Sequence, residues 1–158
     1  MKTSSRFTVA VHILSVIALS GNVLCTSDYL ARSVNTNPVV IRRLLGKLKT
    51  AGIVNVHAGA GGAYLQKELA NITLLDIYQA VETVEAGELF QFHETPNLDC
   101  PIGANIQLVL EAILLQAQSA LEGILAGVTL DDLTTKLIDK INNAIQPTMS
   151  DLIKKSEG

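Results

Sequence analysis

Four cationic side chains gather within eight residues of the chain, at Arg42, Arg43, Lys47 and Lys49. Residues 1–67 hold eight lysines and arginines against one acid, a formal charge of +7, whereas the remainder carries −10, which gives the net charge of −3. Guanidinium groups donate paired hydrogen bonds to phosphates and to the edge of guanine. The first part of the chain is therefore expected to meet a polyanion, and nucleic acid is the leading candidate.

The other reactive side chains are two cysteines, Cys25 and Cys100. Two cysteines form no disulfide framework and are not spaced as a zinc pair, so we expect a reducing cytoplasm. Cys100 precedes Pro101 before a long helix, whose positive end favours the thiolate, which makes Cys100 a candidate oxidant sensor. Cys25 is the other thiol that could pair with it, in the same or a second subunit. An inert thiol at 100 and a small core residue at 25 are the alternatives.

A thiol enzyme is a competing class of function. His93 lies seven residues before Cys100, but the sequence shows no third orienting group and no phosphate-binding glycine motif after a strand. The three histidines do not cluster, so we expect neither a metal nor another cofactor. The sequence thus predicts that the chain is not an enzyme.

The elements that position these residues begin with a helix over residues 4–20. Its apolar run Phe7–Leu19 is interrupted by His12 and Ser15 and is shorter than the roughly 20 residues that span a bilayer. We expect a buried helix at this position, with neither a secretion signal nor a membrane contact.

A short helix and a basic helix follow. Thr26 or Ser27 caps the first, and Asn37 caps the second, with Pro38 at the first helical position. In the short helix the residues expected to point inward are Tyr29, Leu30 and Val34. In the basic helix the apolar arc expected to face the core is Val40, Ile41, Leu44, Leu45, Leu48 and Ala51, and Gly52 ends the helix.

Residues 53–57 and 63–65 alternate as two strands around the glycine-rich tip 58–62. Short helix, turn, basic helix and hairpin in this order predict a winged helix-turn-helix that binds double-stranded DNA. Arg42 and Arg43 are expected to read bases, and Lys47 and Lys49 to anchor phosphates. The full set of expected DNA contacts is Arg6, Thr26, Ser27, Asn37, Pro38, Val39, Arg42, Arg43, Lys47, Lys49, His57, Gly59, Gly61 and Gly62.

The second half of the chain is predicted to be helical. Thr73 caps a helix over 74–84, a long helix over 104–125 has its apolar residues in near-heptad order, and Thr129 caps a last helix that ends near Ile141. The predicted fold is mainly α, with a winged helix-turn-helix domain over 1–85, a loop over 86–103, dimerisation helices over 104–142 and a tail over 143–158.

Several segments resemble the Rrf-type winged-helix transcriptional regulators of bacteria. They are the helix start Asn37-Pro38, the run from Leu44 to Val54, the wing from Gly59 to Leu65, and the run from Ile72 to Glu82. The resemblance covers residues 1 to about 85 well and the rest more weakly. It implies a homodimer that binds a pseudo-palindromic operator, usually as a repressor, with the long helix crossing the dimer interface.

Two positions depart from the pattern of the family. Its iron–sulfur members carry three clustered cysteines in the loop before the long helix, where this chain has Cys100 alone, so we expect no cluster. Some members sense oxidants through a cysteine at this place. Ala58 replaces the arginine that often precedes the first wing glycine. A protein-interaction adaptor that keeps the fold as a scaffold remains a further alternative.

Overall fold

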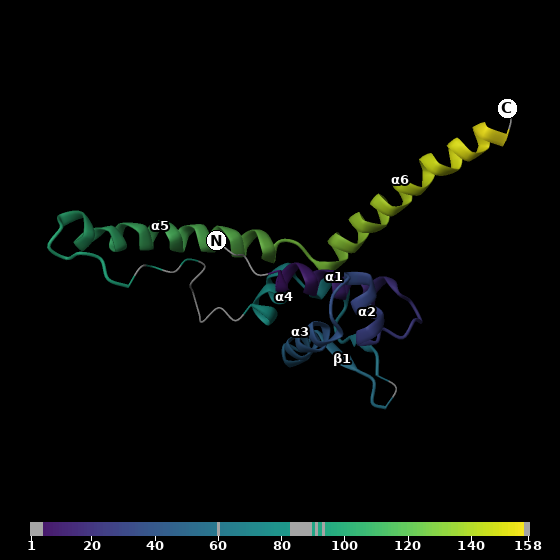
Figure 1. Cartoon of the computed structure of the whole chain (residues 1–158), viewed down its shortest axis with the longest axis horizontal. Helices are drawn as coiled ribbons and strands as arrows, with labels where there is room; N and C mark the ends of the chain where they lie inside the picture. Colours follow the sequence, from purple (N-terminus) through teal and green to yellow (C-terminus); the bar gives the residue numbers. More distant parts are fainter. Residues whose placement is uncertain (1–4, 60, 83–89, 91, 93, 157–158) are drawn as a thin grey trace.

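The chain forms six α-helices, a 3₁₀ turn and one β-hairpin within residues 5–59, 61–82, 90, 92 and 94–156, which the computed structural model describes (Figure 1). The elements are α1 (Arg6–Leu19), α2 (Ser27–Val34), α3 (Pro38–Thr50), β1 (Val54–Val56), β2 (Ala63–Leu65), η1 (Leu69–Asn71), α4 (Leu74–Val81), α5 (Pro101–Ala126) and α6 (Leu130–Ser156). This mainly helical architecture with a small antiparallel hairpin confirms the predicted fold class.

Helix α1 is the centre of the N-terminal domain, because α2, α3, α4, α6 and β2 all pack against it. Ala10, Ile13 and Leu14 are completely buried. The buried hydroxyl of Ser15 donates a hydrogen bond of 2.8 Å to the carbonyl oxygen of Val11, so its polarity is satisfied inside the helix. The apolar run of α1 is thus a core helix, as its composition predicts.

The helix-turn-helix forms from two capped helices. The Oγ1 of Thr26 accepts a hydrogen bond from the Tyr29 N–H at 3.2 Å, and the Oδ1 of Asn37 accepts one from the Val39 N–H at 2.8 Å. Between them Asn35 adopts the left-handed conformation with φ 57°, which ends α2 and turns the chain into α3. The predicted caps of both helices are confirmed.

The buried face of α3 is narrower than the predicted arc. Ile41, Leu44 and Leu48 are buried, and so is Leu45, but Val40 is 41% exposed and Ala51 is also exposed. Val40 lies at the edge of the arc, about a quarter of the helix circumference from its middle, so no neighbouring element covers it. Tyr29 is predicted to point into the core as well, but it is 38% exposed at the start of α2.

Strands β1 and β2 pair antiparallel, with Val54 opposite Leu65 and Val56 opposite Ala63. The backbone N–H of Ala63 also donates a bond of 2.8 Å to the carbonyl of Cys25, which ties the hairpin to the connection between α1 and α2. Gly62 has φ +88° and lies against Leu24, where a β-carbon would overlap the leucine side chain. The positive φ is the feature that favours glycine there, since the exposed Leu24 side chain can move aside.

The starts of α4 and α6 are joined by an antiparallel bridge between Thr73 and Thr129. Each threonine also closes a capping box, with Asp76 and Asp132 respectively. The N–H and hydroxyl of Thr129 bond the Asp132 carboxylate and lower its pKa. The bridge places Leu130 of α6 in the core of the winged helix, completely buried.

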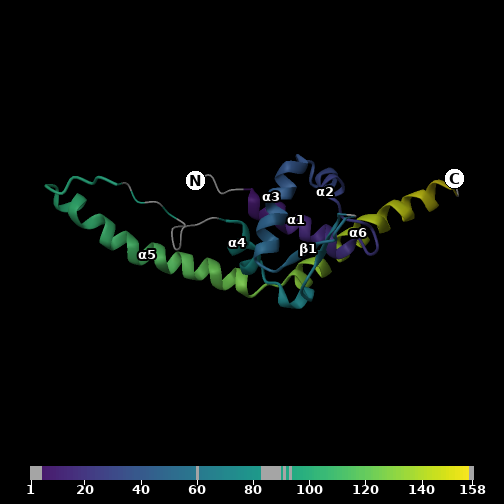
Figure 2. The same cartoon turned by 90° about the horizontal axis from the view of Figure 1, so that it is seen from below.

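Helices α5 and α6 extend from the N-terminal domain in opposite directions (Figures 1 and 2). α5 packs on α4 near its own C-terminal end, and none of its residues is buried. By length and composition α5 is also long and apolar enough to cross a membrane.

Several boundaries differ from those predicted. α5 begins at Pro101, three residues early, and α4 ends at Val81; residues 83–89 lie outside the described residues. α6 continues to Ser156, so 143–156, predicted as a tail without assigned structure, is helical. Its signal is the four-residue spacing of Leu137, Ile141 and Ile145, which the presence of Pro147 obscures.

Candidate nucleic-acid interface

The outward face of α3 carries the two arginines of the basic helix. Arg42 and Arg43 are exposed, on the side of α3 turned away from the buried leucines. Val39 in the first turn is 54% exposed, and Lys49 in the last turn is exposed as well. Asn37 and Pro38 fix the start of the helix, so the exposed face begins at an ordered N-terminus.

Lys47 lies apart from this face. Its Nζ donates a hydrogen bond of 3.1 Å to the carbonyl oxygen of Val81, at the last residue of α4, and the side chain is half-buried. The lysine cation also suits the negative end of α4. This bond conflicts with the prediction that Lys47 anchors a phosphate, because its ammonium group is engaged inside the domain.

Three further predicted contacts lie at the starts of α1 and α2. Arg6 is the first residue of α1 and is exposed. Thr26 and Ser27 are half-buried, and the Thr26 hydroxyl oxygen already caps α2. The start of α2 can therefore offer a phosphate its backbone N–H groups.

The wing residues divide into a tip and a base. His57 and Gly59 are exposed, Gly61 is half-buried, and Gly62 is buried beneath Leu24. Gly62 therefore shapes the wing and, being buried, has little surface to offer DNA, contrary to the prediction. The His57 ring lies on the Tyr64 ring, with centroids 4.4 Å apart and planes inclined by 31°.

Two exposed residues are not among the predicted DNA contacts: Val40, near the start of α3, and Tyr29, in α2. An exposed valine at the start of such a helix can contact the methyl group of thymine. Both side chains are predicted to face the core, because valine and tyrosine are largely apolar. The signal that could have found Val40 is its place at the edge of the buried arc.

Cys100 is the N-cap residue of α5 and is half-exposed. The N–H groups of Gly103 and Ile102, in the first turn of α5, lower the pKa of the thiol. A β-carbon on Gly103 would overlap the carbonyl oxygen of Asn97, so glycine lets the turn before α5 fold back onto the helix. The predicted direction of the pKa shift at Cys100 is confirmed.

Cys25 is buried in the core, only 3% exposed. Its thiol lies 3.5 Å from the carbonyl oxygen of Val23. The start of α5, where Cys100 lies, is far from α2 in both views (Figures 1 and 2). The structure therefore does not bring the two thiols of one chain together, and a pairing between subunits stays a prediction. His93, the partner considered for an enzyme, lies outside the described residues.

A helix-turn-helix with a basic outward helix and a hairpin wing defines the class of winged-helix DNA-binding regulators. Residues 3–136 match the Rrf2 family, described as iron-dependent transcriptional regulators, and the chain belongs to this family. It is therefore a DNA-binding transcriptional regulator and not a thiol enzyme.

Individual relatives agree with this assignment. YwnA of Bacillus subtilis (strain 168), named as an HTH-type transcriptional regulator, is 45% identical over 134 residues, which cover 85% of this chain and 98% of YwnA. A crystal structure described as that of a DNA binding protein is 40% identical, with a TM-score of 0.66, and the match covers 82% of this chain and 98% of that one. CymR of B. subtilis, the global cysteine regulator, shares the fold at 20% identity, with a TM-score of 0.63 over 85% of this chain and 97% of CymR.

The family description raises the question of iron. The sequence holds two cysteines, of which Cys25 is buried in the core and Cys100 caps α5. Among the described residues no three His, Cys, Asp or Glu side chains come together as a metal site. Iron–sulfur clusters are held mainly by several cysteine thiolates. The residues present therefore do not fit a cluster, and the expectation of no cofactor stays a prediction.

Proposed function

We propose that this regulator represses transcription in the cytoplasm as a homodimer that places one α3 in each half of a pseudo-palindromic operator. The observation that carries the proposal is the division of α3 into two faces. Leu44 and Leu48 hold one face in the core, while Arg42 and Arg43 stand exposed on the other. Reading of the major groove requires this combination of a fixed helix and free donors.

Within this arrangement each predicted contact has a separate role. Arg42 and Arg43 read base edges, and the exposed first turn at Val39 brings the start of α3 close to the groove. Lys49 binds a phosphate. Backbone-positioning contacts come from Arg6, Thr26, Ser27, His57, Gly59 and Gly61.

The dimer is proposed to form on α5. Its apolar side chains are exposed along the whole helix, with Ile102 at 73%, Leu108 at 70% and Ile124 at 70%. Exposed apolar surface of this extent marks an interaction site. A second copy that covers it would hold two winged helices together, and half-sites then lie about one DNA turn apart or a multiple of that.

A lipid bilayer is the other environment that the length of α5 admits. Glu111 lies near the middle of the helix, however, at a position that a spanning helix would carry into the bilayer. A carboxylate near the centre of a membrane costs about 2.5 to 3.5 kcal/mol. A protein partner leaves such side chains at the edge of the interface, which favours the dimer.

The role of α3 is tested by replacing Arg42 and Arg43 with alanine. If both arginines read guanines, each loss costs about 1 to 3 kcal/mol, so the double variant should lose at least about 2 kcal/mol and bind its operator at least about 30-fold more weakly. Gel-shift titration measures this. The matched control is Lys136→Ala with Lys140→Ala, which removes two charges from exposed positions of α6 and should bind like the wild type. Equal loss in both double variants would contradict base reading by α3.

Repression is tested separately, by transcription in vitro from a promoter that carries the operator. Addition of the protein should lower the yield of transcript, and the Arg42→Ala, Arg43→Ala variant should not. A rise in transcript would make the protein an activator. Absence of any specific DNA complex would favour the adaptor alternative instead.

A further inference from the structure

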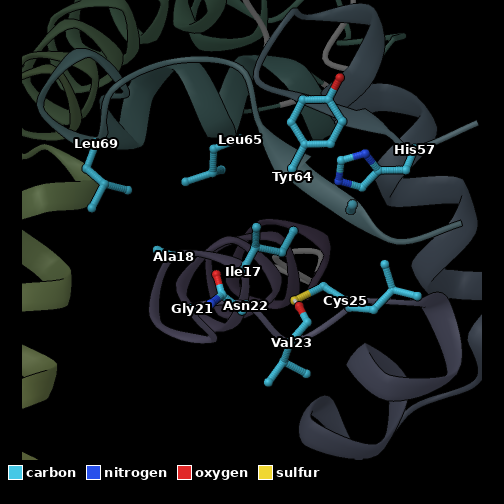
Figure 3. A pocket seen from close by; sticks show the side chains of 12 residues that line it. Ile17, Ala18, Gly21, Asn22, Val23, Cys25, His57, Tyr64, Leu65 and Leu69 are labelled. Atoms are coloured by element: carbon cyan, nitrogen blue, oxygen red, sulfur yellow. Dashed lines mark hydrogen bonds between the residues drawn. The ribbon is translucent and has the colours of Figure 1, made fainter. Parts of the chain in front are cut away.

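A cavity of about 420 Å³ lies between the C-terminal end of α1, the connection from α1 to α2, and the base of the wing (Figure 3). Its volume falls within the range of about 300 to 1,000 Å³ that is usual for small-molecule sites. Cys25, His57 and Tyr64 line it together with aliphatic side chains such as Ile17 and Leu65. None of these residues has a part in the reading of bases by α3.

We propose that this cavity binds a small uncharged aromatic molecule, and that its occupation changes the affinity of the protein for its operator. The binding site stands on the cavity alone, whereas the effect on the operator rests on the proposed function. The ligand class follows from the charge and the shape of the lining.

The lining favours an uncharged ligand. Among the described residues that line the cavity there is no Asp, Glu, Lys or Arg, so neither an anion nor a cation would meet an opposite charge from them. Ile17 and Ala18 belong to the last turn of α1, and the C-terminal end of a helix carries a partial negative charge. That end disfavours anions in particular. Asn22 and His57 can each give one hydrogen bond to a hydroxyl, carbonyl or N–H group.

The shape favours a ring. The stacked side chains of His57 and Tyr64 form one wall, and Ile17 and Cys25 stand across from them (Figure 3). A flat apolar molecule of one or two rings presents one face to the aromatic pair and the other to the aliphatic wall. Aromatic contacts of this kind contribute beyond the area that they bury.

The two walls are also the parts that position the wing. The carbonyl of Cys25 accepts the hydrogen bond from Ala63 of β2, and Leu24 lies against Gly62 at the turn into β2. Thr26, which follows Cys25 in the chain, caps α2. A ligand inserted between these walls would therefore shift the wing and the start of α2 together. Both are proposed to contact DNA.

The binding test uses 2-naphthol as the probe and 2-naphthalenesulfonate as its anionic counterpart. The chain contains no tryptophan, so naphthalene fluorescence can be followed against tyrosine emission alone. We expect saturable binding of 2-naphthol and at least tenfold weaker binding of the sulfonate. Nuclear Overhauser effects should join the naphthol protons to the methyl groups of Ile17 and Leu65. Equal binding of the two probes, or contacts to α5 methyl groups instead, would overturn the assignment.

Substitutions locate the site independently. Ala18→Phe fills the cavity and should abolish naphthol binding, whereas Leu19→Phe adds a ring at the next residue of α1, outside the lining, and should not. If Ala18→Phe does not fold, Tyr64→Ala gives the second test, because it removes one ring of the wall at a partly exposed position and should weaken binding several-fold. Wild-type affinity in either folded cavity variant would overturn the proposal.

Operator binding closes the experiment. Saturating 2-naphthol should change the dissociation constant of the wild type for its operator at least threefold and leave that of Ala18→Phe unchanged. If naphthol binds in the cavity and the operator affinity stays constant, the coupling to the wing is refuted. If the protein binds no operator at all, the proposed function fails, while the naphthol measurements still decide the site.

Discussion

Cys100 illustrates how one residue acquires chemistry from the helix that it caps. The first-turn N–H groups of α5 lower the pKa of its thiol, so more thiolate is present near neutral pH than on a free cysteine. Alkylation of Cys100 requires the thiolate, so its rate should fall only when the pH drops through this lowered pKa. Cys25, which is 3% exposed and lines the cavity at the base of the wing, is less accessible to a reagent than Cys100.

We therefore expect iodoacetamide to label Cys100 first, with a rate midpoint below the value of about 8.5 for an unperturbed thiol. Mass spectrometry across a pH series measures both the site and the midpoint. Oxidant should change operator affinity in the wild type and not in Cys100→Ser. Labelling of Cys25 ahead of Cys100, or the same oxidant response in the serine variant, would make Cys100 a structural residue.

Lys47 shows where residue-level prediction ends. Helical spacing correctly separates the buried leucines of α3 from Arg42 and Arg43. It also places Lys47 with the outward cations, because spacing alone says nothing about the neighbour at the helix flank. The carbonyl of Val81 comes from a segment far along the chain, and only the packing of α4 on α3 brings it within 3.1 Å of Lys47.

For the elements too, local features such as helix caps can be predicted from the sequence, whereas contacts between distant segments cannot. Thr73 and Thr129 are both predicted as caps, since each begins an apolar helical pattern. Their bridge is not predicted, because β-pairing of single residues between distant segments leaves no periodic pattern. The bridge also brings Leu130 into the core of the winged-helix domain. The sequence predicts that this domain ends near residue 85, so the contribution of Leu130 is not predicted.

The cap of α4 gives a stability prediction. Thr73→Ala removes the side-chain acceptor for the Asp76 N–H, and the free energy of unfolding should fall by about 1 kcal/mol. Thr73→Ser keeps the acceptor and should lose only a fraction of that. Urea unfolding followed by circular dichroism measures both variants. An alanine variant as stable as the wild type would show that the cap does not contribute to folding.

The whole molecule is organised around the uncovered apolar surface of α5. Leu115 is 58% exposed, so Leu115→Glu should cost a monomer little but place two charges in a dimer interface. We expect this variant to sediment as a folded monomer at micromolar concentration and to bind the operator more weakly. Gln116→Glu adds the same charge at the neighbouring exposed position without removing apolar surface and serves as the control. A wild-type dimer that persists in Leu115→Glu would place the interface elsewhere.

The bridge between the starts of α4 and α6 also makes α5 a lever. With 26 residues at 1.5 Å each, α5 is roughly 39 Å long, and a tilt of about 10° at its C-terminal end displaces the far end by roughly 7 Å. Successive base pairs are separated by about 3.4 Å along the DNA axis. In the proposed dimer, a tilt of this size about a contact at the far end of α5 would therefore shift one recognition helix against the other by about two base pairs.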